Sequence, residues 1–353
     1  MIKRISTKGY NLAFDTETGV MARWGATHDD DPEMCPLGPE ILDVEVSTIC
    51  NGPTGTPCPW CYKSNGPAGK NMSAETFKRL VEKLPKSVTQ VALGIGDVHA
   101  NPDLWRIMGL CREHGIVPNI TVNGAGIDEA TAEKLAGICG AVSVSHYGHD
   151  DICFGAVQRL TAAGLKQVNL HAVVAAETYK GCFALLDAVS TDPRLRGVKA
   201  VVFLLLKPKG KRNKLTPLAG VEEYRKLLDY AQERNVGVGM DSCSAPMALK
   251  VLGKPAATYV EPCESGLFSL YVDVNAEAFP CSFSAGSPGW ETGIDVLAAE
   301  DFCRDVWYSH RLSAWRERLL ASSQGCGGCE HRAGCRSCPI YDITPCREKN
   351  AQF

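Results

Sequence analysis

The chain has 353 residues, which is long enough for a barrel-sized core of about 200–250 residues with a second domain attached. Its composition, 45% hydrophobic and 22% charged residues, is typical of a globular protein. The net charge of −3 gives no general attraction to nucleic acid or to an anionic membrane. No apolar run approaches the roughly 18 residues of a membrane span, and no secretory signal is recognisable, so we expect a cytoplasmic protein.

The first 240 residues predict a small N-terminal extension followed by a barrel. Residues 1–40 alternate around Thr18 and Gly19 like a β-hairpin. Residues 41–240 alternate between short apolar runs and amphipathic stretches, which predicts an α/β fold. The expected strands span residues 41–47, 88–95, 115–122, 140–146, 167–174 and 199–206. Six β-then-α units in series predict a parallel sheet with right-handed crossovers, which is a partial (β/α)6 TIM-like barrel.

Seventeen cysteines are an unusual number for a protein of this kind. Because no secretory signal is recognisable, metal binding explains them better than a disulfide framework. Beyond about residue 240 the periodicity fades while Cys, Gly and Pro rise, so we expect a separate Cys-rich unit at residues 241–353. Four scattered cysteines lie in apolar periodic segments and are interpreted as core residues: Cys111, Cys139, Cys153 and Cys182.

Three cysteines, Cys50, Cys58 and Cys61, lie in the Gly- and Pro-rich loop after the first expected strand. A cluster of four irons and four sulfides takes one thiolate per iron, so three cysteines leave one iron with an open coordination position. The same loop could hold a zinc ion if a fourth ligand came from elsewhere. In parallel barrels the loops after the strands carry the chemistry, so this rim is the expected active site.

The loop resembles that of the radical S-adenosylmethionine (radical SAM) enzymes, which have three cysteines after the first barrel strand and an aromatic residue before the last. Trp60 matches that aromatic residue, while Cys50 and Cys58 are separated more widely than is usual in the family. The segment GIGDVHANPDLW, at residues 94–105, resembles the family's Gly-Gly-Glu-Pro segment. The segment TVNG, at residues 121–124, resembles its Thr-Asn-Gly.

The resemblance implies two cofactors in the barrel: a [4Fe-4S] cluster on Cys50, Cys58 and Cys61, and S-adenosylmethionine on the open iron. Asp97 would hold the amino group of S-adenosylmethionine through charge-assisted hydrogen bonds. The other implied contacts to this cofactor are Trp60, Gly96, Asn123, Ser143, Ser145, His171 and Lys207. Two of these residues have an ordinary alternative, since Asp97 could belong to a strand-to-helix turn and His171 to the core.

The C-terminal segment CGGCEHRAGCRSC, at residues 326–338, resembles the SPASM extension of radical SAM enzymes, which carries two auxiliary four-iron clusters. The resemblance implies that one of them is held by Cys326, Cys329, Cys335 and Cys346. The other would be held by Cys263, Cys281 and Cys338, with Cys243 as the candidate fourth ligand. Partners could be exchanged between the two sets, and a pair of zinc knuckles is the alternative. Two cysteines have no counterpart and are expected to be unligated, Cys35 and Cys303.

A radical SAM enzyme cleaves S-adenosylmethionine reductively to a 5′-deoxyadenosyl radical that abstracts hydrogen from a substrate. The resemblance implies a peptide substrate undergoing post-translational modification and a flavodoxin- or ferredoxin-type reductant. Either a separate protein binds the leader of that peptide, or the substrate is not a peptide of this kind. Ser282 follows Cys281 where sulfatase-maturating relatives have an aspartate, so formylglycine formation is not expected. Modification of a small metabolite or nucleotide is a second interpretation, and a zinc or iron-sulfur electron-transfer module is the non-enzymatic one. No catalytic acid or base can be assigned.

The loop LKPKGKRNKL, at residues 206–215, carries five cations after the sixth expected strand. We expect Lys207, the cation nearest to the strand, to serve the active site. The three outer cations are expected to steer an acidic substrate, and they are Lys211, Arg212 and Lys214. A solvated charged loop is the alternative.

Overall fold

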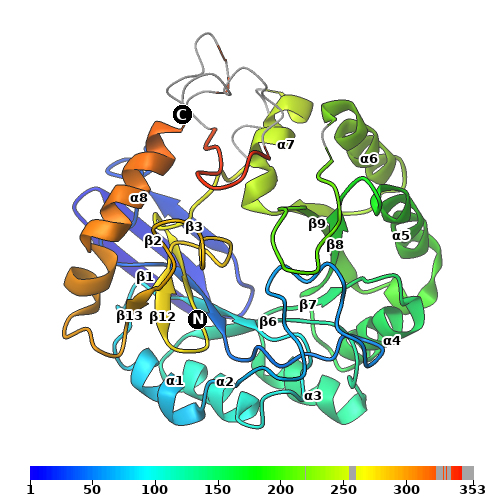
Figure 1. Cartoon of the computed structure of the whole chain (residues 1–353), viewed down its shortest axis with the longest axis horizontal. Helices are drawn as coiled ribbons and strands as arrows, with labels where there is room; N and C mark the ends of the chain where they lie inside the picture. Colours follow the sequence, from blue (N-terminus) through cyan, green and yellow to red (C-terminus); the bar gives the residue numbers. More distant parts are fainter. Residues whose placement is uncertain (219, 254–259, 323–328, 330, 332–334, 344–353) are drawn as a thin grey trace.

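The computed structural model describes residues 1–218, 220–253, 260–322, 329, 331 and 335–343. The six expected barrel strands are present, lie side by side in chain order and run parallel (Figure 1). They are β4 (Ile41–Glu45), β5 (Gln90–Gly94), β6 (Val117–Val122), β7 (Val142–Ser145), β8 (Val168–Val174) and β9 (Val198–Leu205). The prediction of a partial parallel barrel is therefore confirmed.

One helix follows each of these strands and covers the outer face of the sheet (Figure 1). The helices are α1 (Ala74–Val81), α2 (Leu104–Glu113), α3 (Glu129–Ile138), α4 (Asp150–Ala162), α5 (Tyr179–Thr191) and α6 (Val221–Glu233). The Ser73 hydroxyl accepts a hydrogen bond from the Thr76 amide at 3.1 Å, and Asp128 accepts one from the Thr131 amide at 2.8 Å. These N-caps satisfy free amides of the first turn and explain where α1 and α3 begin.

Strand side chains alternate between the core under the helices and the barrel interior. On β4, Leu42 and Val44 are buried in the core, whereas Asp43 between them faces the opposite side of the sheet. Asp43 lies in register with Ala92 of β5 on one side and with Tyr271 on the other. Polar side chains therefore line part of the interior, where a polar ligand could be held.

The barrel sheet continues beyond its six strands into the Cys-rich part of the chain. β10 (Val238–Met240) pairs in parallel with β9, and β11 (Ser269–Val272) pairs in parallel with β4 at the other edge. β12 (Glu277–Phe279) and β13 (Ile294–Asp295) then extend this edge in antiparallel fashion, which makes one sheet of ten strands. A boundary near residue 240 would therefore cross a continuous sheet, and the division of the chain there remains an interpretation.

Further helices accompany the Cys-rich part. α7 (Ala245–Leu252) follows β10, and α8 (His310–Ala321) follows a π-helical turn at Phe302–Trp307. Short 3-10 turns lie at Pro193–Leu195 and Ser242–Ser244.

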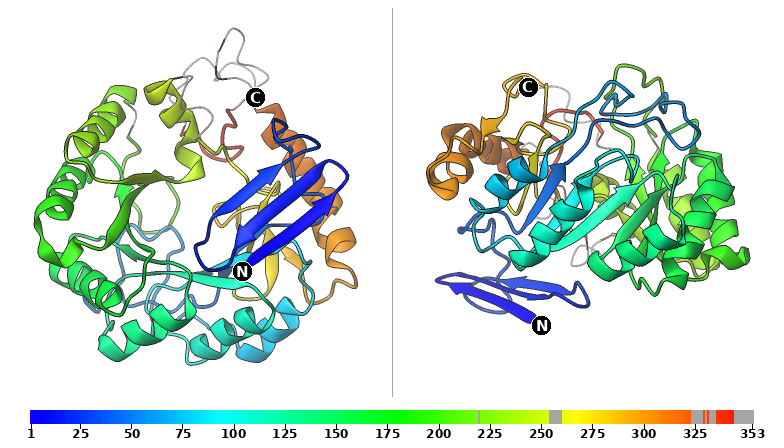
Figure 2. Two further views of the ribbon diagram at one scale, coloured as in Figure 1. Left: turned by 180° about the vertical axis from the view of Figure 1, so that it is seen from behind. Right: turned by 90° about the horizontal axis from the view of Figure 1, so that it is seen from below.

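The N-terminal residues form a small antiparallel sheet of three strands, β1 (Ile2–Thr7), β2 (Tyr10–Asp15) and β3 (Met21–Trp24). The expected hairpin is the β2–β3 pair, and β1 adds a strand that the sequence pattern did not predict. The right-hand view of Figure 2 places this sheet on the opposite side of the molecule from the loop that follows β4. Tyr10 and Leu12 of β2 pack with Leu267 and Phe268, so the sheet is anchored next to β11.

No helix in the described ranges combines the length and the apolar character needed to cross a membrane.

Candidate functional site

The loop between β4 and α1, residues 46–72, has two arms that are bonded to each other. The Thr48 amide donates a hydrogen bond to the Lys70 carbonyl at 2.9 Å. A Cβ atom at Gly69 would lie 2.4 Å from the Thr48 backbone, so the arms approach too closely for a side chain at that position. We call this segment the cysteine loop. The contact between its two arms holds the loop over the rim of the barrel.

The three thiols of the cysteine loop converge. Burial raises the pKa of Cys58 to about 11, and the nearby Cys50 and Cys61 sulfurs add to this by repulsion. Tyr147, which follows β7, is their common neighbour: burial raises its pKa, and all three sulfurs act in the same direction. A thiol with a raised pKa is protonated at neutral pH, so a metal must displace the proton when it binds.

The number of converging thiols distinguishes the needs of an iron-sulfur cluster from those of a single zinc ion. Two sulfurs on one zinc stand about 4 Å apart, given Zn–S bonds of about 2.3 Å, whereas the thiolates of a cluster bind different irons and stand farther apart. Three thiols are the number that a cluster with one open iron requires, whereas a structural zinc ion would need a fourth ligand from elsewhere.

The ends of β5 and β6 pack against the Cys50 sulfur. The Asn123 amide donates a hydrogen bond to the Gly96 carbonyl at 2.8 Å, and the Asn123 Nδ2 atom lies 4.0 Å from the Cys50 Sγ atom. A Cβ atom on Gly96 would lie 2.4 Å from the same sulfur. Gly96 is therefore required because any side chain would collide with the thiol.

Replacing Gly96 with Ala is expected to lower the iron content of the Cys50 site by up to about four irons per chain, because the methyl group must displace the sulfur. Anaerobic reconstitution followed by iron and sulfide analysis measures this. Gly109→Ala on α2 is the matched control, since its added Cβ would lie 3.9 Å from the nearest neighbour. Full iron content in the Gly96 variant would contradict the close packing of Gly96 on Cys50.

Asp97 lies beside the same thiol. Burial raises the pKa of Cys50, and the negative charge of Asp97 contributes in the same direction. Its Oδ1 atom accepts a hydrogen bond from the His99 amide at 2.9 Å, which fixes the carboxylate in a turn. Among the described residues Oδ2 has no hydrogen-bond partner, so this oxygen is free to accept a hydrogen bond from an ammonium group.

Ser143 and Ser145 of β7 and His171 of β8 are on the inner face of the sheet. Ser143 is in register with Thr121 of β6, and Ser145 is in register with His171. Burial lowers the pKa of His171 to about 4, against an opposing effect of the Asp241 carboxylate. The imidazole is therefore neutral at pH 7 and can accept a hydrogen bond from a ligand in the interior.

Trp60 and Lys207 occupy different surroundings. The Trp60 ring centroid lies 6.2 Å from that of Tyr147, so the indole is beside the three thiols. The Lys207 side chain is only 3% exposed, and its ammonium is paired with Asp241. The structure thus gathers seven of the eight expected cofactor residues around the cysteine loop and the inner face, while Lys207 is held at the end of β9.

A second group of four thiols converges next to β11 and β12. Burial raises the pKa of Cys263 to about 12, with Cys281 and Cys338 as nearby sulfurs. Burial also raises the pKa of Cys243, with Cys263 and Cys338 among its neighbours. The residue proposed from sequence as a fourth ligand therefore lies with the other three.

The remaining cysteines are placed as follows. Of the set expected to bind the other auxiliary cluster, Cys329 and Cys335 are described, whereas Cys326 and Cys346 lie outside the described residues. The Cys303 thiol donates a hydrogen bond to the Leu37 carbonyl at 3.3 Å. Five cysteines are buried away from both groups: Cys35, Cys111, Cys139, Cys153 and Cys182.

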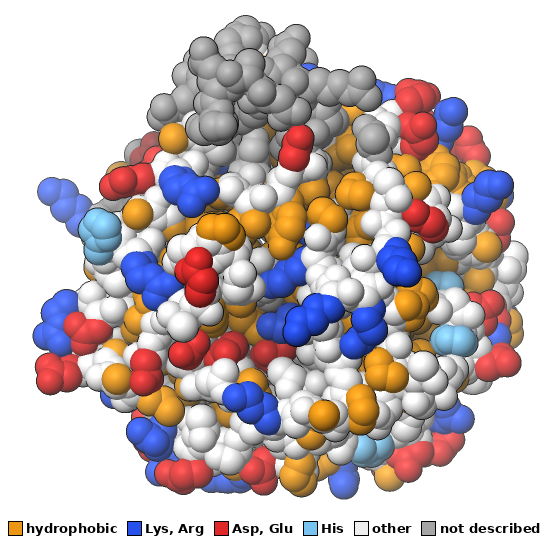
Figure 3. Space-filling model, viewed as in Figure 1, with side chains coloured by type: hydrophobic (Ala, Val, Ile, Leu, Met, Phe, Trp, Pro, Cys, Tyr) orange, Lys and Arg blue, Asp and Glu red, His pale blue; other side chains and the backbone are white. Residues whose placement is uncertain are grey.

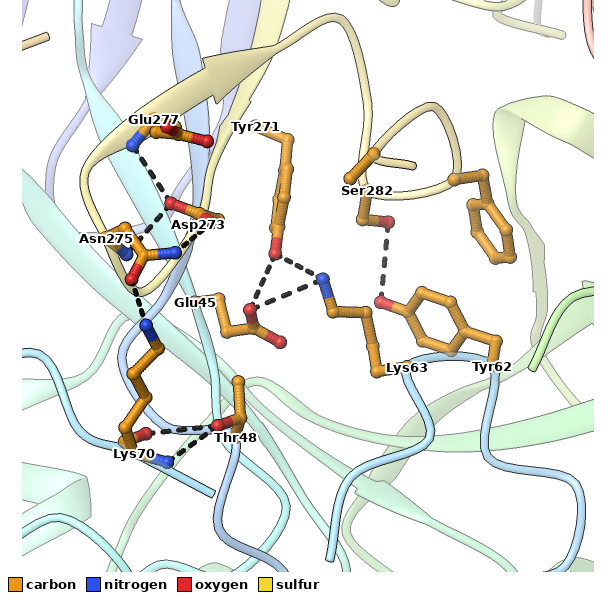
Figure 4. A network of polar contacts seen from close by, with 12 residues as sticks. Glu45, Thr48, Tyr62, Lys63, Lys70, Tyr271, Asp273, Asn275, Glu277 and Ser282 are labelled. Atoms are coloured by element: carbon orange, nitrogen blue, oxygen red, sulfur yellow. Dashed lines mark hydrogen bonds and ion pairs between the residues drawn. The ribbon is translucent and has the colours of Figure 1, made fainter. Parts of the chain in front are cut away.

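A polar network that the sequence analysis missed joins the cysteine loop to the floor of the interior (Figure 4). The Lys63 Nζ atom lies 3.3 Å from the Glu45 carboxylate and donates a hydrogen bond to the Tyr271 hydroxyl at 2.5 Å. That hydroxyl donates a hydrogen bond to Glu45 at 2.9 Å. Beside this triad, Tyr62 and Ser282 approach each other to 3.4 Å. The network ties the loop of the three thiols to β4 and β11.

One acidic group in the interior has no polar partner among the described residues. The Asp43 side chain is solvent-exposed within the barrel, and the protein around it raises its pKa to about 6, so its carboxyl group changes charge close to neutral pH. The only signal for Asp43 and Glu45 in the sequence is the pair of charges inside the otherwise apolar run ILDVEVS. Such residues, placed at alternate positions of a buried strand, share one face and are candidates for the site.

The rim of the barrel is charged on the face that carries the cysteine loop. Lys and Arg side chains gather in the middle of this face, with Asp and Glu side chains directly beside them (Figure 3). The Arg212 guanidinium donates a hydrogen bond to the Asn65 carbonyl at 2.7 Å, and the Lys211 amide donates one to the Ser64 hydroxyl at 2.8 Å. The cationic loop after β9 is thus bonded to the cysteine loop and forms part of the same rim.

Comparison with known sequences gives a match over most of the chain. No protein-family model matches it. The mycofactocin maturase MftC of Mycobacterium tuberculosis is 24% identical over 320 residues, which cover 84% of this chain and 77% of that protein.

Solved structures share the fold. Streptococcus suis SuiB bound to S-adenosylmethionine has a TM-score of 0.67 and 18% identity, covering 86% of this chain and 73% of that chain. SuiB bound to its precursor peptide SuiA has a TM-score of 0.68 and 17% identity, with 88% and 76% covered. The anSMEcpe structure with bound AdoMet and the Cp18Cys peptide has a TM-score of 0.63 and 17% identity, with 87% and 91% covered.

Proposed function

We propose that this chain, a radical SAM enzyme with a SPASM-type C-terminal extension, modifies a residue of a peptide. The similarity to a maturase in sequence, and to two enzymes whose structures contain bound peptides, supports a peptide as the substrate. The polar and charged interior of the barrel supports the same class, because a peptide offers amide and side-chain groups for Asp43, His171 and the β7 serines to bind.

Cys50, Cys58 and Cys61 would hold the [4Fe-4S] cluster that binds and reduces S-adenosylmethionine. When bound, this pair of cofactors supplies a 5′-deoxyadenosyl radical, which abstracts a hydrogen atom from the substrate. The observation that carries the proposal is the convergence of the three thiols beside Asp97 at the rim of the barrel.

The chain's own residues would bind and orient the cofactor. The free oxygen of Asp97 would accept a hydrogen bond from the methionyl ammonium group. Asn123 would support the Cys50 side of the site, to which its Nδ2 atom is close. Ser143, Ser145 and the neutral His171 would offer hydrogen-bonding groups to the ribose and carboxylate from the inner face of β7 and β8.

Replacing Asp97 with Asn is expected to weaken S-adenosylmethionine binding by about 1.5–3 kcal/mol, which is the range for a hydrogen bond to a charged group. The Asn side chain retains the turn with His99 but lacks the negative charge. Isothermal titration calorimetry of the anaerobic, iron-loaded protein measures the affinity. Asp128→Asn, at the exposed N-terminus of α3, is the control and should bind with wild-type affinity. Unchanged affinity in the Asp97 variant would show that the amino group binds elsewhere.

The peptide proposal is tested separately from the cofactor chemistry. With a strong reductant and S-adenosylmethionine, the protein should form 5′-deoxyadenosine slowly without any substrate. Short peptides encoded beside the gene should then accelerate this reaction and change in mass when analysed by mass spectrometry. Cofactor cleavage without a mass change in any such peptide would contradict the peptide substrate while leaving the radical SAM chemistry intact.

The remaining partners are part of the same proposal. A flavodoxin- or ferredoxin-type protein would supply the electron for cofactor cleavage, and a separate leader-binding protein would present the peptide. The second thiol group, Cys243, Cys263, Cys281 and Cys338, would hold one auxiliary cluster. The other auxiliary cluster would use Cys326, Cys329, Cys335 and Cys346.

A further inference from the structure

Two lysines of the loop after β9 point away from the solvent and toward the second thiol group. The Lys207 ammonium pairs with Asp241 and lies over the Phe283 ring at 4.9 Å. The Cys243 sulfur is near enough to interact with this ammonium group electrostatically. Asp241 is engaged by further donors, since it accepts hydrogen bonds from the Ser244 hydroxyl and from a β9 amide. Lys207 is therefore held in one position against a candidate cluster ligand.

Lys209 reaches a different ligand of the same group. Its ammonium donates hydrogen bonds to the carbonyls of Ser282, Phe283 and Ala285, at 2.9, 3.2 and 2.8 Å. These carbonyls belong to the turn that follows Cys281, whose sulfur is near enough to interact with the ammonium group electrostatically. No carboxylate is paired with Lys209 within the described ranges, and burial together with the Lys63 charge lowers its pKa to about 8, so the group is mainly cationic at pH 7.

The positive charges of Lys207 and Lys209 would affect the reduction potential of a cluster bound to the neighbouring thiols. A four-iron core of charge +2 on four thiolates has a net charge of about −2, and net charge and hydrogen bonds to the sulfurs are among the factors that set its reduction potential. A cation near a thiolate stabilises the reduced form, which carries one more negative charge. A partly buried cation acts strongly in this way because it is less screened than a surface charge, and Lys207 also offsets the negative charge of Asp241 near Cys243.

We propose that Lys207 and Lys209 raise the reduction potential of an auxiliary cluster that is held by Cys243, Cys263, Cys281 and Cys338. This inference rests on the cluster assignment of the proposed function and goes beyond it. It departs from the expectation that Lys207 binds S-adenosylmethionine, because its ammonium group is already paired with Asp241 at the end of β9. The lysines then adjust how readily this cluster takes up an electron.

The experiment is a redox titration followed by electron paramagnetic resonance, on anaerobically reconstituted full-length protein. The signal to follow is the one that Cys281→Ala removes from the parent protein. The test variants are Lys207→Gln and Lys209→Gln, which keep a hydrogen-bond donor and lose the charge. Lys207→Arg and Lys209→Arg keep the charge, and Lys211→Gln is the matched control on the exposed part of the same loop.

Each Gln variant is expected to lower the ratio of reduced to oxidised cluster about tenfold at a fixed potential, which corresponds to a midpoint lower by about 59 mV. The Arg variants and Lys211→Gln should titrate like the parent. Gln variants with full iron content and the parent midpoint would overturn the proposal. Loss of iron from the Gln variants would also overturn the proposal, because the lysines would then be needed for assembly of the cluster. Absence of any signal dependent on Cys281 in the parent would refute the cluster assignment instead.

Discussion

Replacing Cys50, Cys58 and Cys61 together with Ala is expected to remove about four of about twelve irons per chain and to abolish 5′-deoxyadenosine formation. The total corresponds to the three four-iron clusters of the proposed function, and the loss is expected because these thiols converge on one site. Iron analysis after anaerobic reconstitution measures the first effect. Chromatography of the nucleosides formed with a strong reductant and S-adenosylmethionine measures the second.

Cys303→Ala is the matched control for this experiment. The Cys303 thiol is half-buried, donates a hydrogen bond to a backbone carbonyl and belongs to neither thiol group, so its loss should change neither iron content nor nucleoside formation. A protein that binds stoichiometric zinc and negligible iron would contradict the cluster assignment. Unchanged iron in the triple variant would contradict the convergence of the three thiols on a cluster.

The strands and helices of the barrel could be predicted because their pattern is local. Runs such as residues 167–174 are apolar enough to indicate a strand without knowledge of its neighbours, and β8 spans Val168–Val174. The N-caps Ser73 and Asp128 mark their helices through bonds within four residues. Structural features that depend on bonds between residues close in the chain can therefore be predicted from the sequence.

The pairing of β11 with β4 could not be predicted in this way. The two strands are more than 220 residues apart, and nothing in Ser269–Val272 specifies a parallel partner at the edge of the barrel. The network of Glu45, Lys63 and Tyr271 depends on that pairing, because it joins β4, the cysteine loop and β11. A network built across non-local pairs becomes visible only once the chain is folded.

The neighbours of Lys207 could not be predicted from sequence either, because they are distant in the chain. The place of Lys207 after a barrel strand predicted a residue that serves the active site, whereas β10 and the segment after it supply Asp241 and Cys243 as its neighbours. Sequence spacing does not reveal that these residues meet. The chemistry of the cysteines was easier to predict, since thiols grouped at short spacing in a chain without a secretory signal are typical of metal sites.

One buried arginine joins the N-terminal sheet to the start of β4 and to the residue next to Cys263. Arg23 of β3 is 8% exposed, and its guanidinium bonds Glu40 at 3.0 Å and Glu264 at 2.9 Å. It also lies over the Phe268 ring at 3.5 Å. Glu40 is fully buried and accepts a further hydrogen bond from the Tyr10 hydroxyl at 2.5 Å. This ion pair connects the N-terminal sheet, the start of β4 and the residue next to Cys263.

Replacing Arg23 with Met is expected to lower the free energy of unfolding by about 3–5 kcal/mol, because the substitution leaves the Glu40 carboxylate buried without its counter-ion. Urea unfolding under anaerobic conditions, followed by circular dichroism, measures the loss as a lower midpoint. Arg159→Met is the matched control, since Arg159 is half-exposed and pairs with Glu129 at 3.3 Å, and it should cost about 0–1 kcal/mol. Arg23→Lys, which keeps the charge, should fall between the two.

The loss in the Arg23→Met protein is also expected to shrink as the pH falls from about 7 to 5. Burial raises the pKa of Glu40, and Arg23 opposes this effect, so removing the guanidinium must raise the pKa further. A carboxyl group whose pKa is higher in the folded than in the unfolded state binds its proton preferentially in the folded state, which stabilises the fold at low pH. A midpoint difference that is the same at pH 5 and pH 7 would show that the lost packing on Phe268, and not the unpaired Glu40 charge, causes the destabilisation.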